Sequence, residues 1–408
     1  MKILHCCLAG GYTERCAYQE NMLTELHRAH GHDVLVAAST ESVTGGRFVN
    51  LPAGDDVTAS GIKIKRLPYA DYVPGPLKNK IRVFPGFEGV IEDYRPDVIF
   101  FHSVASHELL TAARYKKNNP DTALLVDSHA ALSNSARSFI SKQFQHKLYY
   151  RSLYRRTHRY IDRLFYIGME EKDYLTDVLG ISERNIEFLP LGGLIFDGAF
   201  KNSVRERVRG ELGLSEDDLV LCHSGKLSAL KRTEVLLGAM RMINDRRVKL
   251  LIIGKAEGAI MDSINEAAAA DDRIRFLGWA TADRLRECLC ASDIYAQPGD
   301  VSATMQNALC CGVPAVALGI ETYRRQFGDD SGVIFLNDKT FSGTRKELDE
   351  QLSDEQTESD ILAFVRIIGD VLSGGLPLDV LGENARSYAA QHLDYEAQAR
   401  MIESMSKA

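Results

Sequence analysis

Four stretches of the chain place glycine, histidine, lysine or serine directly after an apolar run, and these residue types suit anion binding and proton transfer. The stretches are "LAGGYTE" (8–14), "LLVDSHAAL" (124–132), "HSGKLSALKR" (223–232) and "PGDVSATMQNAL" (298–309). In open α/β sheets, ligands bind beyond the carboxyl ends of the strands. We therefore expect the chemistry of this protein in these four loops.

The first two loops offer a glycine pair and a histidine. Gly10 and Gly11 would let the backbone approach a phosphate at the start of a helix, although a bare tight turn explains them equally well. His129 follows a buried run beside Asp127, where an imidazole can exchange protons. A structural or merely exposed histidine is the alternative, and His102 in "FFHSVAS" holds a similar strand-end position.

The last two loops suit an anion. A turn at Ser224 and Gly225 is expected to bring Lys226 and Lys231 to the end of a strand, where two cations can clamp a diphosphate without a metal. Two solvated surface lysines are the alternative. In the fourth loop Ser302 is expected to cap a helix whose first amides, those of Ala303, Thr304 and Met305, point at a bound anion.

Short apolar runs alternate with helical patterns along the whole chain, which predicts an α/β fold with two doubly wound Rossmann-like domains and parallel sheets. We expect an N-terminal domain over residues 1–191, a hinge at Gly192 and Gly193, and a C-terminal domain over residues 194–385. Residues 40–66 are interpreted as an insertion with a hairpin. Residues 386–408 are expected to form a C-terminal helix that returns to the first domain.

The composition excludes several classes of protein. The chain has 408 residues and a formal net charge of −7, so its overall charge does not favour binding to nucleic acid. The eight cysteines lie in apolar runs without a Cys-x-x-Cys pair, so we expect reduced core thiols in a cytoplasmic protein. The apolar run after Lys2 is too short for a signal peptide, and no stretch is typical of a membrane span.

Taken in order, the loops resemble the GT-B fold glycosyltransferases, in particular the retaining family 4, over nearly the whole chain. The resemblance rests on these motifs: "AGGYTE", "GHDVLVAAS", "PDVIFFHS", "VDSHA", "LPLGG", "SGKLSALKR", "LLIIGKAEG", "RIRFLGWA", "ASDIYAQPG" and "NALCCGVPAVA". It implies a hexosyltransferase whose two domains face a deep cleft. The C-terminal domain would hold a nucleotide sugar there and the N-terminal domain the acceptor.

The resemblance also assigns roles to single residues. Gly225, Lys226 and Lys231 should face the donor diphosphate, with Lys226 standing where an arginine is commoner, and His129 should lie near the donor sugar. The other implied contacts are Gly10 and Gly11 near phosphate or acceptor, Gly278 and Trp279 beside the base, and Ser302, Ala303, Thr304 and Gln306 at the diphosphate and ribose.

The chain departs from the family at two glutamates that are commonly separated by seven residues. Alignment on the Gly-x-Pro turn puts Gln306 at the second glutamate, where an amide can still bond the ribose, and Pro298 at the first. Asp300 or Ser302 would fill that space. The loss of the first glutamate leaves the identity of the donor sugar open.

The implied reaction is retaining and metal-independent, with no cofactor besides a nucleotide-sugar donor, expected to be a UDP-sugar. A donor phosphate oxygen would take the proton of the acceptor hydroxyl, so no protein nucleophile is required. The alternatives are a GT-B epimerase or phosphorylase, and a catalytically silent GT-B partner subunit. The intact lysines and His129 argue against a silent subunit.

Residues 137–163 carry eight Lys or Arg against one Asp, with aromatic residues interleaved. Such a helix can lie on an anionic membrane surface, which would place a peripheral protein on the inner face of the cell membrane. The acceptor would then be a lipid-linked saccharide, as in bacterial surface polysaccharide assembly. An ordinary amphipathic helix that packs its aromatics onto the sheet explains the pattern equally well.

Overall fold

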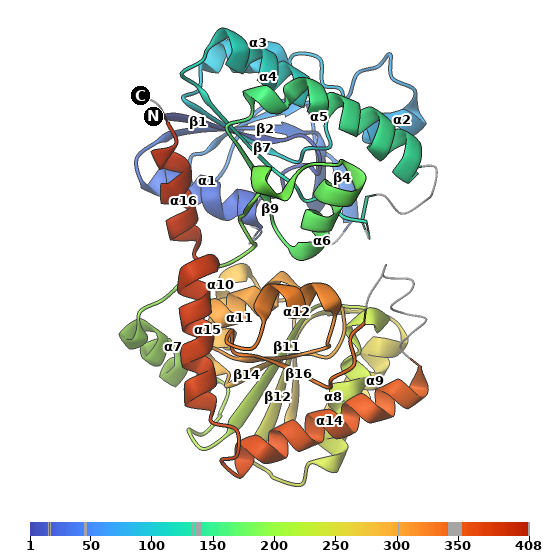
Figure 1. Cartoon of the computed structure of the whole chain (residues 1–408). Helices are drawn as coiled ribbons and strands as arrows, with labels where there is room; N and C mark the ends of the chain where they lie inside the picture. The colour runs from blue at the N-terminus through green and yellow to red at the C-terminus, as the bar shows by residue number, and fades with distance from the viewer. Residues whose placement is uncertain are drawn as a thin grey trace. The chain divides into compact units, whose positions relative to one another are not determined.

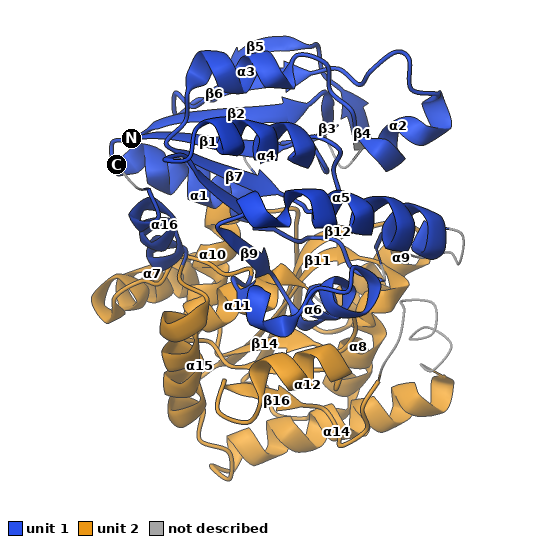
Figure 2. Cartoon of the chain, turned by 45° about the horizontal axis from the view of Figure 1, so that its top comes forward, with its two compact units in different colours: residues 1–190, 395–408 blue, residues 191–394 orange. Residues whose placement is uncertain are grey.

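The computed structural model describes residues 1–14, 16, 18–44, 47–132, 134–135, 141–300, 302–341 and 353–406. These residues form two compact units, one of residues 1–190 with 395–408 and the other of residues 191–394 (Figure 2). Helices lie against a largely parallel β-sheet in each unit (Figure 1). The expected pair of doubly wound α/β domains is confirmed.

The first unit contains a sheet with the strand order β10-β9-β8-β7-β1-β2-β6-β5, in which only the edge pair β5–β6 is antiparallel. Its strands are β1 (Lys2–Cys7), β2 (Asp33–Ser39), β5 (Gly54–Val57), β6 (Lys63–Leu67), β7 (Val98–His102), β8 (Ala123–Asp127), β9 (Arg163–Tyr166) and β10 (Glu187–Phe188); β3 (Glu41–Thr44) and β4 (Arg47–Asn50) form a separate hairpin.

The helices of this unit connect the strands and cover the sheet (Figure 1). They are α1 (Gln19–Ala29), α2 (Gly75–Ile81), α3 (Phe87–Tyr94), α4 (Leu109–Asn118), the π-helix η1 (Ser141–Tyr150), α5 (Arg151–Thr157), η2 (His158–Tyr160), α6 (Met169–Asp173), the π-helix η3 (Tyr174–Val178), η4 (Glu183–Asn185) and α16 (Tyr395–Ser404). Helix α16, at the end of the chain, belongs to this unit and lies beside α1.

The second unit has a parallel sheet with the strand order β13-β12-β11-β14-β15-β16. Its strands are β11 (Leu219–Leu227), β12 (Val248–Ala256), β13 (Ile274–Gly278), β14 (Ile294–Gln297), β15 (Ala315–Ala317) and β16 (Val333–Phe335). Its helices are α7 (Gly198–Glu211), η5 (Ala229–Lys231), α8 (Thr233–Met242), α9 (Ala259–Ala270), α10 (Ala282–Ala291), α11 (Ala303–Cys310), α12 (Glu321–Phe327), α14 (Asp354–Leu372) and α15 (Leu378–His392).

The central strands explain why the sequence adopts this fold. Every residue of β7, "VIFFH", and of β8, "ALLVD", is buried, as expected for strands covered on both faces of a parallel sheet. Polar residues enter these strands only at their last positions, His102 and Asp127. The sheet therefore delivers polar side chains to its carboxyl edge and apolar ones to the core.

Two local predictions are wrong. Residues 40–66 contain the expected hairpin, formed by β5 and β6, but they are not a simple insertion, because β6 joins the main sheet beside β2 and only β3 and β4 stand apart. The turn expected at Ser224 and Gly225 is also absent. Strand β11 continues to Leu227 because its pairing with β12 runs without a break through Gly225 and Lys226.

No helix among the described residues is both long and apolar enough to span a bilayer.

Candidate functional site

A pocket of about 250 Å³ lies at the carboxyl ends of β1, β7 and β8 in the first unit. It is lined by Cys7, Ala9, Gly10, Gly11, Glu20, Arg82, His102, Ser103, His129, Ala130, Asn134 and Ser135. Three predicted site residues, Gly10, Gly11 and His129, therefore meet in one place. They come from two loops more than a hundred positions apart in the chain.

The two glycines of the pocket differ in what the backbone requires. Gly11 has a φ of +74°, and a β-carbon there would lie 2.3 Å from the carbonyl oxygen of Glu41, so a side chain cannot be accommodated. A β-carbon at Gly10 would meet nothing within 4 Å. The fold thus explains Gly11, whereas Gly10 leaves its backbone open toward the pocket.

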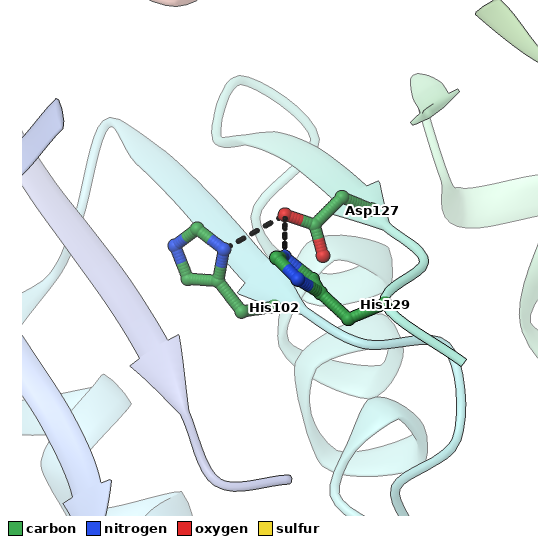
Figure 3. Close-up of side chains that lie close together, drawn as sticks. All are labelled: His102, Asp127 and His129. Carbon is green, nitrogen blue, oxygen red and sulfur yellow. Dashed lines mark hydrogen bonds and ion pairs between the residues drawn. The ribbon is translucent and has the colours of Figure 1, made fainter. Parts of the chain in front are cut away.

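Asp127 is the centre of a buried polar cluster at the wall of this pocket (Figure 3). Its Oδ2 atom accepts hydrogen bonds from Nδ1 of His102 at 2.8 Å and from Nε2 of His129 at 3.2 Å. Its Oδ1 atom accepts the backbone N–H of Ser103 at 2.9 Å. Three donors thus hold a carboxylate that has no access to solvent.

This arrangement fixes the charge of the cluster. Burial works against ionisation of Asp127, but His129 and His102 outweigh it and hold the pKa of this carboxyl well below its usual value. Burial likewise works against a charged His129, but the carboxylate of Asp127 outweighs it and raises the pKa of His129 to about 9. At neutral pH the pocket therefore presents an imidazolium.

The sequence holds a signal for His102 in its position at the end of a strand. Strands β7 and β8 are neighbours, and their register pairs His102 with Asp127 directly. Both residues are the last of their strands, so alignment of the two strand ends would have brought them together. His5, which bonds His102 on the far side at 3.0 Å, lies inside "KILHCC", where it reads as an ordinary core position.

His102, Asp127 and His129 are the described residues whose metal-ligating atoms lie within 4.8 Å of one another. A carboxylate only accepts hydrogen bonds, so the nitrogen of each histidine that faces Asp127 is assigned a hydrogen. With these hydrogens in place the cluster is a hydrogen-bonded ion pair, and a cation would have to displace both of them.

In the second unit, the two predicted lysines have different surroundings. Lys226 is an exposed residue of β11, and no hydrogen bond or ion pair holds its side chain among the described residues. Lys231 is buried in η5, and its Nζ donates to the carbonyl oxygen of Asp300 at 2.8 Å. Lys231 thus joins the loop after β11 to the loop after β14, while Lys226 leaves its charge available to a ligand.

Gly225 lies beside this junction with a φ of +134°, and its register partner on β12 is Gly254. A β-carbon at Gly254 would lie 1.9 Å from the carbonyl oxygen of Gly225. The two strands can approach this closely only because Gly254 has no side chain, while the positive φ of Gly225 favours glycine at that position. Gly225 therefore has a structural role in addition to any contact with a ligand.

The predicted helix cap at Ser302 is confirmed, because its Oγ accepts the N–H of Thr304 at 3.3 Å at the start of α11. The amide of Met305 donates to the carbonyl oxygen of Ser302. Two of the three amides expected to bind an anion are therefore engaged inside the first turn, which leaves Ala303. Gln306 is buried on the same helix, and Val301 lies outside the described residues.

Gly278 and Trp279 lie at the end of β13, an edge strand two positions from β11 in the sheet. Gly278 has a φ of +69°, and the Trp279 side chain is 70% exposed. The two residues share the carboxyl edge with Gly225 and Ser302, but the structure does not place them in direct contact with either. An exposed indole at this edge is available for stacking with a planar ligand.

Comparison with known proteins identifies both halves of the chain. Residues 17–192 match the glycosyl transferase 4-like domain, and residues 204–362 match the glycosyl transferases group 1 domain. The chain belongs to the glycosyltransferases with the GT-B fold. The two matches follow each other in the order of the two structural units, and together they contain every predicted site residue except Gly10 and Gly11.

Curated relatives of this glycosyltransferase match over part of their length. D-inositol 3-phosphate glycosyltransferase of Mycobacteroides abscessus is 27% identical over 168 residues, which are 39% of this chain and 37% of the relative. The same enzyme of Geodermatophilus obscurus is 28% identical over 189 residues, 42% of each chain. The matched part thus spans less than half of either relative.

Solved structures share the fold over nearly the whole chain. Anabaena Alr3699/HepE in complex with UDP has a TM-score of 0.65 at 17% identity and covers 100% of both chains. Sucrose-phosphate synthase from Thermosynechococcus elongatus has a TM-score of 0.64 at 16% identity and covers 99% of this chain and 98% of its own. At such identities the likeness shows the GT-B fold.

The basic segment of this glycosyltransferase is described from Ser141 onward, and its residues 137–140 lie outside the described residues. Tyr150 and Leu153 are buried in the core of the first unit, as the alternative of an ordinary packed helix predicts. The outer side of the segment carries both apolar and charged side chains. The exposed residues are Phe144, Leu148, Arg155, Arg156, His158, Arg159, Asp162 and Arg163.

Proposed function

We propose that this glycosyltransferase moves a sugar from a nucleotide sugar, with a UDP-sugar as the expected donor, to a hydroxyl group of a saccharide or lipid-linked saccharide. The observation that carries the proposal is the succession of a glycosyl transferase 4-like domain and a group 1 domain in one chain. Support for the donor comes from Anabaena Alr3699/HepE, whose structures contain UDP and UDP-glucose.

The second unit is proposed to bind the donor. Lys226, with a free and exposed ammonium group, would bind the diphosphate beside the backbone of Gly225. Ser302, Ala303, Thr304 and Gln306 would complete the diphosphate and ribose contacts, and Gly278 and Trp279 would border the base. Lys231 would act mainly by holding the loop of Asp300 in place, because its Nζ already donates to that backbone.

The pocket of the first unit is proposed to receive the acceptor and the sugar end of the donor. Its imidazolium at His129 would stabilise an oxygen that gains negative charge during transfer. Asp127 is an unsuitable nucleophile, because three N–H donors already occupy its carboxylate. This environment is consistent with a retaining reaction in which a donor phosphate oxygen takes the proton, and the protein supplies position and charge.

The decisive experiment has two parts. Isothermal titration against UDP, GDP, ADP and dTDP should show binding of UDP, and incubation with UDP-sugars and saccharide acceptors should release UDP with an anomerically retained product. EDTA should leave the rate unchanged, since no step requires a cation. Binding of none of the four nucleotides would refute the proposal. Isomerisation of the sugar nucleotide without an acceptor would replace it by an epimerase.

The exposed face of η1 and α5 is proposed to hold the enzyme on an anionic membrane. Phe144 and Leu148 are 62% and 64% exposed, and Arg155, Arg156 and Arg159 are exposed farther along the same helical segment. Apolar side chains next to cations suit the boundary between lipid headgroups and acyl chains. The enzyme would then act on the inner face of the cell membrane, on a lipid-linked saccharide of surface polysaccharide assembly.

A further inference from the structure

A chain of hydrogen bonds crosses three neighbouring strands of the first sheet and ends at the pocket. Strands β8, β7 and β1 lie side by side, and they carry Asp127, His102 and His5 respectively. Nδ1 of His5 lies 3.0 Å from Nε2 of His102, and Nδ1 of His102 lies 2.8 Å from Oδ2 of Asp127. His5 is fully buried and His102 is 6% exposed, so water does not compete for these contacts.

The carboxylate of Asp127, at one end of this chain of hydrogen bonds, determines which ring nitrogens carry a hydrogen. A carboxylate only accepts, so Nδ1 of His102 must carry a hydrogen. In a neutral His102 the other nitrogen, Nε2, is then bare and accepts the Nδ1 hydrogen of His5. One arrangement of hydrogens therefore satisfies the bonds of Asp127, His102 and His5 with both rings neutral.

Charging His102 would disrupt this arrangement. A hydrogen on Nε2 of His102 would meet Nδ1 of His5, and His5 would have to move its own hydrogen to Nε2. The Nε2 atom of His5 is buried and has no hydrogen-bond partner among the described residues. Burial penalises such an N–H without an acceptor, so His5 opposes a positive charge on His102.

A positive charge is more favourable on His129 than on His102. His129 bonds the same Oδ2 atom of Asp127, but its side chain is 32% exposed and lines the pocket. A positive charge there lies closer to solvent than one on His102 would, and it is still paired with the carboxylate. Either histidine can carry the positive charge beside Asp127. Because His5 disfavours a charge on His102, the charge lies on His129, in the pocket.

We propose that His5 is a positioning residue of the pocket, which keeps His102 neutral and thereby leaves the positive charge beside Asp127 on His129. Its use in catalysis rests on the proposed function, because the charge would face the reacting oxygens of donor and acceptor. His5 itself touches no ligand. Its effect is transmitted through His102 and Asp127.

Other charged and titratable groups surround this chain of hydrogen bonds. Glu20 of α1 and Glu171 of α6 favour a charged His129, and Arg82 also lines the pocket. His5 faces His27 of α1, with ring centroids 5.3 Å apart. Burial lowers the pKa of His27 to about 4 and that of His5 well below its usual value, so both stay neutral at physiological pH.

Nuclear magnetic resonance of the histidine rings in the free, full-length protein tests the proposal. At pH 7.5 the wild type should show His129 as an imidazolium, and His102 and His5 as neutral rings with the hydrogen on Nδ1. His5→Leu removes the donor to His102, so His102 should take up a proton and the pKa of His129 should fall by about one unit or more. His5→Asn keeps a donor near the position of Nδ1 and should restore the wild-type pKa.

The controls separate this effect from general damage. His27→Gln alters a buried histidine that lies beside His5 but takes no part in the chain of hydrogen bonds. It should leave the tautomer of His102 unchanged. A wild-type spectrum in which His102 carries the charge would overturn the proposal even if His5→Leu failed to fold. An unchanged pKa of His129 in a folded His5→Leu protein would overturn it as well.

Activity supplies a second and independent readout. The alkaline limb of the pH profile of kcat/KM should move to lower pH in His5→Leu by the same amount as the pKa of His129, and His5→Asn should move it back. Because the spectra are recorded without substrate, they can uphold the role of His5 even if no glycosyl transfer is found. In that case the proposed function falls while the assignment of the charge stands.

Discussion

The Nδ1 atom of His102 lies 2.8 Å from Oδ2 of Asp127, and both side chains end neighbouring strands of one parallel sheet. His129 reaches the same oxygen from the loop that follows the second of these strands. The carboxylate therefore acts as the common anchor of two histidines, only one of which is substantially exposed in the pocket. A change at Asp127 must affect both.

Replacement of Asp127 by Asn keeps the size of the side chain and removes its charge. The pKa of His129 should fall from about 9 to below its ordinary 6.5, because burial then acts without an opposing anion. Transfer at pH 7.5 should slow by about 10²-fold if the imidazolium stabilises the reacting oxygens. Ring titration by magnetic resonance and initial rates check the two statements, with Asp121→Asn, an exposed aspartate, as the control.

The same variant has a predicted effect on stability. The lowered pKa of Asp127 contributes stability that is lost as the pH falls, and the raised pKa of His129 contributes stability that is lost as the pH rises toward about 9. The difference in free energy of unfolding between wild type and Asp127→Asn should therefore be largest between about pH 4 and 6.5, the unfolded-state values. A difference independent of pH would contradict the ion pair.

The pocket shows how far sequence reasoning reaches. The rule that ligands bind at strand ends was enough to select Gly10, Gly11 and His129, because it needs only the positions where apolar runs stop. It could not select His5, since an interior histidine in "KILHCC" has no local feature that distinguishes it from the core. The role of His5 depends on which strands are neighbours in the sheet. The strand order β8-β7-β1 cannot be predicted from any single segment of the sequence.

The second unit shows the limit of local turn signals. Ser224 and Gly225 read as a turn, yet β11 runs on to Leu227 beside β12, where Gly254 leaves room for the carbonyl oxygen of Gly225. The requirement belongs to a pair of residues 29 positions apart. In contrast, the cap at Ser302 was predictable, because a serine before a helical run is a local signal.

The two lysines of the second unit should respond differently to substitution. Lys226→Met should weaken UDP binding by about tenfold without changing the melting temperature, because this side chain is exposed and makes no bond that the fold needs. Lys231→Met should weaken binding and also lower the free energy of unfolding by about 1 kcal/mol, since it removes the bond to Asp300.

Calorimetry for UDP and thermal melts measure both effects of the lysine variants. Lys249→Met serves as the control, because Lys249 lies at the amino end of β12 and bonds the carbonyl oxygen of Arg246. Equal affinity of wild type and Lys226→Met for UDP would exclude Lys226 from the donor site.

Charge reversal of Arg155, Arg156 and Arg159 to Glu should release the protein from anionic liposomes. Each basic residue near such a surface contributes about 1 kcal/mol, so binding should weaken by more than about 100-fold, as co-sedimentation would show. Phe144→Ser with Leu148→Ser should weaken it further.

The control for the liposome experiment reverses three exposed cations elsewhere, Lys63, Arg114 and Arg246, whose side chains are 64%, 61% and 66% exposed. If both triple variants lose binding equally, net charge and not this helical face is responsible. If the first variant still sediments with the liposomes, the proposed membrane contact is wrong.

Helix α16 should be held to α1 most strongly at mildly acidic pH. Oε1 of Glu403 accepts a hydrogen bond from Nδ1 of His30 at 2.6 Å, and Nε2 of His30 lies 3.0 Å from Oε1 of Glu396. The bond to Glu403 raises the pKa of His30. Burial works against ionisation of Glu403, but its bonds to His27 and His30 outweigh it and lower the pKa of this carboxyl.

These shifts fix the sign of the pH dependence. A raised histidine pKa gives stability that is complete below about 6.5 and is lost as the pH rises, while a lowered glutamate pKa gives stability that is lost on acidification. His30→Gln should therefore reduce the free energy of unfolding by about 0.5–1 kcal/mol at pH 6 and by much less at pH 9.5. Urea unfolding at both pH values, with the exposed His158→Gln as the control, measures the difference. Equal destabilisation at the two pH values would mean that His30 holds α16 by packing alone.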